Sequence, residues 1–117
     1  MKEREHHLQV VCVNWFRMTH KKDAMLLHAI PNGGQRNAIV AAKLKAEGVV
    51  SGIPDLHLPI AKGGHHSLYI EMKAGAKGVV SANQKTMMAL LEEQGNKCVV
   101  CRSFDDFKAA IEGYYSS

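Results

Sequence analysis

The sequence has too few cysteines for a disulfide framework, and it has no apolar run long enough to cross a membrane. It contains three cysteines, an odd number in a chain of 117 residues, which argues against paired structural disulfides. No segment approaches the ~20 consecutive apolar residues of a transmembrane helix, and residues 1–9 are too charged for a signal peptide. We therefore expect a cytoplasmic protein with no membrane partner.

The sequence also lacks the common zinc motifs. Cys98 and Cys101 form a C-x-x-C, but they lie in an apolar run typical of a strand, where residues three apart point to opposite faces. There is no second such pair to complete a zinc site, and there is no H-E-x-x-H. We interpret these cysteines as ordinary buried thiols.

What the chain does have is enough apolar sequence for one core, together with a modest excess of positive charge. With 46% hydrophobic residues and no repeat or linker, residues 1–117 fit a single domain. Fifteen Lys and Arg residues against eleven Asp and Glu residues give a net charge of +4. This excess favours a polyanionic partner such as nucleic acid, although many soluble domains carry a similar charge.

The periodicity of the apolar residues and the positions of Gly, Pro and Ser predict an α/β fold with the order α-β-α-β-β-α-β-α. This order indicates a mixed central sheet flanked by helices. The predicted helices are residues 3–19, 35–47, 82–94 and a last helix from 104, and the predicted strands are 24–30, 56–60, 67–74 and 97–102.

Three charged residues stand in or beside the two central strands. Glu71 and Lys73 share one face of the second strand, and Asp55 would lie close to Glu71 if the strands pair as a hairpin. Two carboxylates so placed repel unless they share a proton or a divalent cation, and their hard oxygens suit Mg²⁺ or Mn²⁺. Spacing alone favours a simpler alternative, in which Glu71 and Lys73 form a solvated pair on an edge strand.

Several short motifs, in their order and spacing, resemble the VRR-NUC nucleases, a branch of the PD-(D/E)XK phosphodiesterase superfamily. The similarity is greatest to the short stand-alone forms that are common in bacteriophages and bacteria, and it spans nearly the whole chain. It implies a restriction-endonuclease-like core and metal-dependent hydrolysis of nucleic-acid phosphodiesters in a bacterial or phage-infected cell. The motifs are EREHHLQ (3–9), HAIPNGGQR (28–36), LKAEGV (44–49), GIPDL (52–56), IEMK (70–73) and SANQK (81–85).

The resemblance assigns roles to the charged residues of the hairpin. Asp55 and Glu71 would be metal-binding carboxylates, and the backbone carbonyl of Met72 would be a further ligand. Lys73 would orient the attacking water and stabilise negative charge on the phosphoryl oxygens. The implied cofactor is Mg²⁺ or Mn²⁺.

The family also carries a glutamate on its first helix, and here the candidate is Glu5. At 100° per residue Glu5 falls within the arc of Leu8 and Cys12, whereas Glu3 falls on nearly the opposite side. Glu5 followed by Gln9 also matches the family pattern, which makes Glu5 a catalytic residue and a further candidate metal ligand, and Gln9 a DNA-binding candidate. The alternative is that Glu5 only interacts favourably with the helix dipole.

Gln84 has two interpretations. With Ser81 it has the form of a capping box, in which the glutamine bonds back to the cap residue and has no part in catalysis. The family places a glutamine at the start of this helix beside the active-site lysine, which makes Gln84 a catalytic candidate. The two roles are compatible.

Arg36 is the candidate for a DNA-phosphate contact outside this cluster. It stands at a predicted helix start after Gly33 and Gly34, where close approach and the helix end favour an anion. The alternative is an ordinary surface arginine.

Together these features predict a divalent-metal-dependent DNA endonuclease. The short stand-alone forms imply a homodimer selective for four-way (Holliday) junctions, because a twofold axis supplies the two symmetric cuts that resolution needs. The apolar content of helices 3–19 and 35–47 makes both candidates for the shared face, and a monomer remains the alternative. Other interpretations are a nuclease for flaps or other branched DNA, and a basic nucleic-acid-binding module without turnover.

Overall fold

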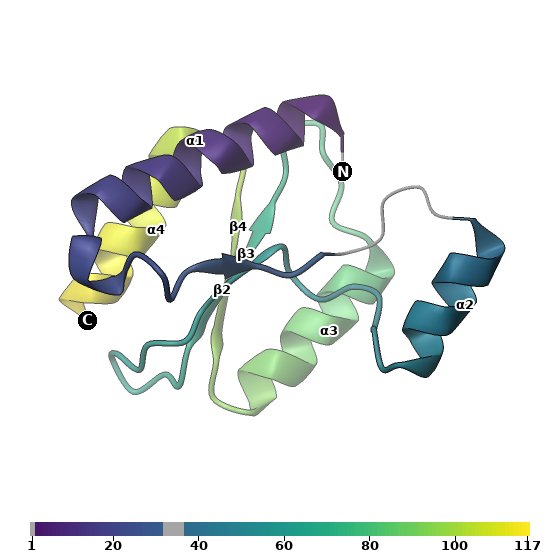
Figure 1. Ribbon diagram of the computed structural model, residues 1–117. Coiled ribbons are helices and arrows are strands. Elements are labelled where there is room, and N and C mark those ends of the chain that lie inside the picture. The colour runs from purple at the N-terminus through teal and green to yellow at the C-terminus, as the bar shows by residue number, and fades with distance from the viewer. Residues whose placement is uncertain (1, 32–36) are drawn as a thin grey trace.

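The computed structural model describes residues 2–31 and 37–117, and its elements follow the predicted order (Figure 1). A short 3₁₀ helix, η1, is added after the first α-helix. The elements are α1 (Glu3–Thr19), η1 (Lys21–Asp23), β1 (His28–Ala29), α2 (Ala38–Ala46), β2 (Leu56–Leu58), β3 (Leu68–Met72), α3 (Ala82–Glu93), β4 (Lys97–Cys101) and α4 (Phe104–Ser116).

The strands form one mixed sheet in the order β1-β2-β3-β4. β1 pairs with β2 and β2 with β3 in antiparallel fashion, whereas β3 and β4 run parallel. The parallel step requires a crossover, and α3 supplies it. The predicted mixed sheet flanked by helices is confirmed.

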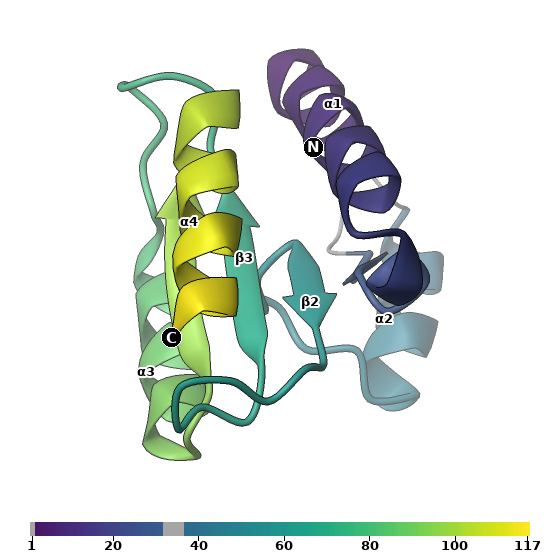
Figure 2. The ribbon, with the colours of Figure 1, turned by 90° about the vertical axis from the view of Figure 1, so that its left-hand side faces the viewer.

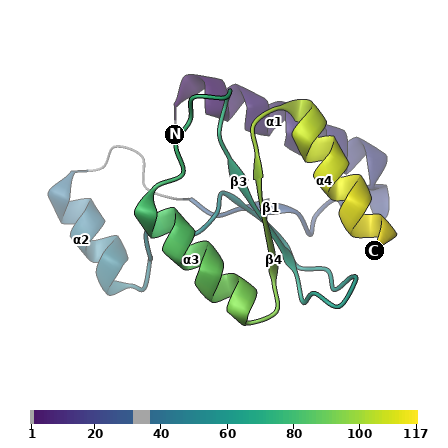
Figure 3. The same ribbon diagram turned by 180° about the vertical axis from the view of Figure 1, so that it is seen from behind.

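Helices cover both faces of the sheet. α1 and α4 lie together on one face (Figure 2). Between them, Trp15 meets Phe104 and Phe107 edge to face. α3 lies on the other face beside β4 (Figure 3), and the Cys98 thiol donates a hydrogen bond to the carbonyl of Met88 there. The core fills the α1/α4 side with Cys12, Phe16, Leu27, Leu56, Leu58, Leu68, Ile70, Met72, Cys101, Phe107, Ile111 and Tyr114.

The predicted strand over residues 24–30 is wrong in its first half. Only His28–Ala29 pair in the sheet. Leu26 N–H donates to the carbonyl of Asp23, and the Arg17 side chain donates to the carbonyls of Ala24 and Leu27, so the chain turns before it enters β1. The apolar run misled because only Leu27 is buried in the core, while Met25 is 83% exposed.

α2 begins later than the predicted helix over residues 35–47. Its N-cap is Asn37, whose side-chain oxygen accepts from Val40 N–H at 2.9 Å, and Ala38 is the first helical residue. Gly48 ends it with a φ of 104°, a conformation that favours glycine. None of the residues of α2, which all belong to the described part of the chain, is buried, and the helix stands apart from the sheet (Figures 1 and 3).

The cysteines are free thiols; Cys12 and Cys101 are buried, whereas Cys98, which the sequence indicated to be buried, is only partly so. Burial raises the pKa of Cys12 to about 11 and those of Cys98 and Cys101 to about 12, which keeps all of them protonated and unreactive at neutral pH. Within residues 2–31 and 37–117, no helix combines the length and the apolar character needed to traverse a bilayer.

Candidate active site

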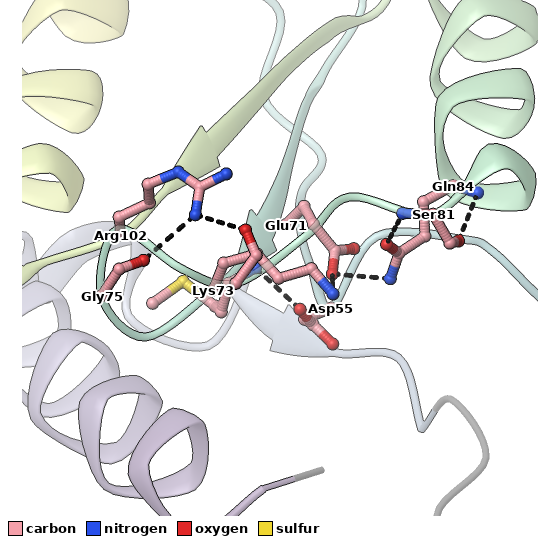
Figure 4. Close-up of polar contacts among 9 residues, drawn as sticks. Asp55, Glu71, Lys73, Gly75, Ser81, Gln84 and Arg102 are labelled. Carbon is pink, nitrogen blue, oxygen red and sulfur yellow. Dashed lines mark hydrogen bonds and ion pairs between the residues drawn. The ribbon is translucent and has the colours of Figure 1, made fainter.

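The β2/β3 hairpin brings Asp55 and Glu71 together. Leu56 pairs with Ile70, so Asp55 enters the hairpin opposite Glu71. The Met72 N–H donates to Asp55 Oδ2 at 2.7 Å and fixes that carboxylate against β3 (Figure 4). Pro54, which is fully buried, sets the entry to β2 with its locked φ. The predicted hairpin is therefore confirmed, and with it the proximity of the carboxylates.

Glu71 and Lys73 are not a solvated surface pair. Glu71 is only 2% exposed, and the side chain of Lys73 is 14% exposed with its Nζ 3.5 Å from Glu71 Oε2. Strand alternation correctly placed both residues on the face opposite the core. It could not reveal that the start of α3 covers this face, and that cover buries the carboxylate.

Gln84 forms the capping box that the sequence predicted and also contacts a carboxylate of the candidate site. Its Oε1 accepts from Ser81 N–H at 2.9 Å, and its backbone N–H donates to Ser81 Oγ at 3.1 Å, which completes the capping box. Its Nε2 donates to Glu71 Oε2 at 2.9 Å (Figure 4). Because the cap occupies the amide oxygen, it leaves the amide N–H groups turned toward the carboxylate. The helix cap thus orients a residue of the candidate site.

The two carboxyls influence each other's ionisation. Burial raises the pKa of Glu71 to about 8, and the neighbouring Asp55 charge adds to the rise while Lys73 opposes it. Burial also raises the pKa of Asp55, but the hydrogen bonds from Met72 N–H and the Glu71 carboxyl, and the charge of Lys73, favour its ionised form. Without a cation, the shared proton therefore belongs to Glu71 at neutral pH.

The donor set fits a hard divalent cation. Glu71 Oε1 is buried, and among the described residues it has no hydrogen-bond donor. A cation at this point would satisfy that oxygen and relieve the repulsion between Glu71 and Asp55. The described residues hold no group of three or more His, Cys, Asp or Glu side chains that could share an ion. Mg²⁺ commonly keeps several waters and takes only one or two protein carboxylates, which Asp55 and Glu71 could supply.

Glu5 and Gln9 lie on the first turns of α1, and Glu5 is near enough to Asp55 to influence its charge. Glu5 is partly buried, and its charge raises the pKa of Asp55. Gln9 Oε1 is buried without a donor in the part of the chain that the structure describes. Gln9 also lines a cavity of about 290 Å³ between α1 and β1. Arg36 lies outside the described residues.

Gly52 is a site residue that reasoning from the sequence did not single out. Its φ is +90°, and a Cβ there would lie 2.8 Å from the carbonyl oxygen of Asn83 at the start of α3. The glycine therefore lets the segment before Asp55 pack directly on the helix that carries Gln84. The GIPD motif contains the signal, but a glycine before a strand has many explanations in a sequence.

Comparison with known proteins agrees with this geometry. The family model of the VRR-NUC domain matches residues 1–105. A solved structure described as a VRR_NUC domain protein superposes with a TM-score of 0.86 at 29% sequence identity, over 99% of this chain and 91% of that chain. No curated protein matches the chain. With its matched domain, fold and paired carboxylates, the chain belongs to the VRR-NUC family, whose domain is that of a nuclease of the PD-(D/E)XK type.

Proposed function

We propose that this protein is a divalent-metal-dependent endonuclease that hydrolyses DNA phosphodiester bonds at the site of Asp55, Glu71 and Lys73. The observation that carries the proposal is the buried, donorless Oε1 of Glu71 beside a second carboxylate and an ammonium group, all within the described part of the chain. A carboxylate left in this state costs folding free energy unless a cation or proton compensates it. At neutral pH without a metal the proton of Glu71 compensates it, and a bound divalent cation would take the place of that proton.

The metal would be held by Asp55, Glu71 and the backbone carbonyl of Met72. When bound, it would lower the pKa of a coordinated water and act as a Lewis acid toward the phosphate. Lys73, held 3.5 Å from Glu71, provides a fixed positive charge for the phosphoryl oxygens as negative charge grows on them. Gln84 keeps Glu71 in place through its 2.9 Å hydrogen bond. No covalent enzyme intermediate is needed.

We assign supporting roles to two residues of α1. Glu5 adds negative charge beside Asp55, which strengthens the attraction of the site for a cation. Gln9 offers an amide, with its oxygen unsatisfied in the described part of the chain, for substrate or water at the cavity between α1 and β1. Both Mg²⁺ and Mn²⁺ suit a site of oxygen ligands.

We further propose that the enzyme is a homodimer selective for four-way junctions. α2 and the segment after it expose a run of apolar side chains, with Ile39 at 72%, Val40 at 39%, Val49 at 43% and Val50 at 47%. A helix with this character is suited to an interface between two copies. A twofold dimer would present two sites for symmetric cuts on two strands. α1, with Val10 at 44% exposed, is the second candidate for the shared face.

The substrate is tested with purified protein on linear duplex, single-stranded, flap and four-way-junction DNA in Mg²⁺ or Mn²⁺. We expect the junction to be cut fastest, and EDTA to abolish all cleavage. Glu71→Gln and Lys73→Ala should remove cleavage and keep much of the DNA affinity. Faster cutting of flaps would replace the junction proposal, and DNA binding with no cutting of any substrate would favour a binding module.

The dimer is tested by light scattering of wild type, Ile39→Asp and Met25→Asp. Met25 is the matched control, because it is an apolar side chain of similar exposure at 83% but lies in the turn before β1. Ile39→Asp should shift the mass toward the 12.9 kDa of one chain and reduce the preference for junctions, while Met25→Asp leaves both unchanged. A wild type of monomeric mass at micromolar concentration would refute the dimer.

A further inference from the structure

We propose that Arg102 is a positioning residue for the nuclease reaction, because it clamps the turn between β3 and α3 and so holds Lys73 in place. The inference rests on the proposed function of Lys73. Arg102 itself lies just beyond β4, and none of the sequence motifs includes it.

The clamp consists of bonds from Arg102 to two glycine carbonyls within the turn. Its Nη1 donates to the carbonyl oxygens of Gly75 at 3.0 Å and Gly78 at 2.6 Å (Figure 4). In return, Gly75 N–H donates to the Arg102 carbonyl at 3.2 Å. Hydrogen bonds from a charged donor are stronger than neutral ones, so this turn is held more firmly than its glycines alone would allow.

The clamped turn connects two residues of the site. It starts at Lys73, whose N–H donates to the Cys101 carbonyl at 3.0 Å, and it ends at Ser81, the N-cap of α3. Gln84, in the first turn of α3, donates to Glu71. A change in the turn would therefore displace Lys73 at one end and the Gln84 amide, which bonds to Glu71, at the other.

Gly78 transmits the effect of the clamp to Lys73 by direct packing. A Cβ built on Gly78 would lie 3.1 Å from Lys73 Cβ and 3.5 Å from its Cδ, so the turn backbone lies against the lysine stem. The stem has little room to move on this side, and its ammonium stays near Glu71. If Arg102 no longer bonds to the Gly78 carbonyl, the turn backbone is no longer held against the Lys73 side chain.

Arginine suits this role better than lysine. One planar guanidinium nitrogen carries two N–H groups at a fixed angle and can reach both carbonyls at once, whereas an ammonium on a flexible stem has no fixed fork. Asp106 anchors the main chain beneath it, because Asp106 Oδ2 accepts from Arg102 N–H at 2.9 Å. This bond ties the backbone of Arg102 to the first turn of α4.

Kinetics test the proposal with Arg102→Ala, Arg102→Lys and, as a matched control, Arg17→Ala. Arg17 also bridges two backbone carbonyls, those of Ala24 and Leu27, but in the turn before β1. We expect Arg102→Ala to lower kcat by up to about 100-fold with little change in KM, as for a small displacement of a catalytic group. Arg102→Lys should recover part of the loss, and Arg17→Ala should keep wild-type kcat.

Gly78→Ala tests the same idea without replacing the arginine, with the new Cβ 3.6 Å from Arg102 Nη1. The new methyl would press on the Lys73 stem, and since Gly78 does not have a positive φ, the backbone itself is not strained. Its control is Gly113→Ala, where, apart from its two chain neighbours and its own helix backbone, a Cβ meets no described heavy atom within 4 Å. We expect a fall in kcat for the first variant only. Wild-type kcat in both Arg102→Ala and Gly78→Ala would overturn the proposal.

A readout without turnover separates this proposal from the nuclease assignment. Partial acetylation with acetic anhydride, followed by peptide mass spectrometry, reports the exposure of Lys73 relative to the exposed Lys108. Arg102→Ala should raise the relative acetylation of Lys73 several-fold, and unchanged acetylation would overturn the clamp. If wild type cuts no DNA, the proposed function fails, while the acetylation result still decides whether Arg102 positions Lys73.

Discussion

Replacing Glu71 with glutamine should stabilise the metal-free protein at high pH although it removes a residue of the site. In the folded chain the pKa of Glu71 is raised from 4.5 to about 8, mainly by burial. At about 1.4 kcal/mol per unit, ionising this carboxyl in the folded state costs at most ~5 kcal/mol relative to the unfolded chain. The neutral amide of the Glu71→Gln variant avoids that cost, and its oxygen can still accept the hydrogen bond from Gln84.

The pH dependence has a definite sign. Because the pKa is higher in the folded state, the folded protein binds more protons than the unfolded chain between pH 4.5 and about 8. The contribution of Glu71 to stability is therefore fully present below pH 4.5 and is lost as the pH rises through about 8. Wild type should lose stability over this window relative to Glu71→Gln.

Urea unfolding in EDTA at about pH 5 and about pH 9, on either side of most of this window, measures the effect, with Glu93→Gln as a control at an exposed position of α3. The stability advantage of Glu71→Gln over wild type is the difference between their free energies of unfolding. This advantage should be several kcal/mol larger at about pH 9 than at about pH 5. Glu93→Gln should follow wild type. If the difference in free energy of unfolding between Glu71→Gln and wild type is the same at both pH values, Glu71 does not hold a proton in the way proposed.

Three further predictions concern the same residues. Mn²⁺ binding at neutral pH should release about one proton, because the cation displaces the proton of Glu71; calorimetry in two buffers of different ionisation enthalpy measures this, and zero release contradicts it. Gly52→Ala should cost more stability and activity than Gly48→Ala, because both glycines have positive φ but only a Cβ at Gly52 meets the Asn83 carbonyl; equal losses in thermal unfolding would assign the effect to φ alone. Gln84→Ala should lower kcat, and it should reduce stability by about 1 kcal/mol because half of the capping box is lost. An unchanged kcat would show that Gln84 acts only as a helix cap.

The strand pattern predicted the site better than it predicted the surroundings of the site. Alternation along β3 placed Glu71 and Lys73 on one face, and the hairpin placed Asp55 beside them. Burial of that face depends on how α3 packs after a crossover, and this is a tertiary property that no local pattern contains. For the same reason the spacing favoured a solvated pair where the structure has a buried carboxylate.

The helix caps could also be predicted from the sequence, but contacts between distant segments could not. The caps at Ser81 and Ser103 follow from side chains that bond to N–H groups three residues later. The prediction of a strand over residues 24–30 was wrong in its first half, because the apolar run there forms a turn that buries only Leu27. The Arg102 clamp joins residues more than 20 positions apart, and the sequence offers only an arginine after a strand.

The most direct test of the metal site is the initial rate of DNA cleavage as Mn²⁺ is titrated into wild type and Asp55→Asn. Asp55 is the sharpest position, because its carboxylate is fixed by Met72 N–H at 2.7 Å and asparagine keeps an oxygen for that bond while removing the charge. We predict saturable activation of wild type, no cleavage in EDTA, and no cleavage by a folded Asp55→Asn at any Mn²⁺ concentration. Cleavage by wild type in EDTA, or a full rate for Asp55→Asn, would contradict the account.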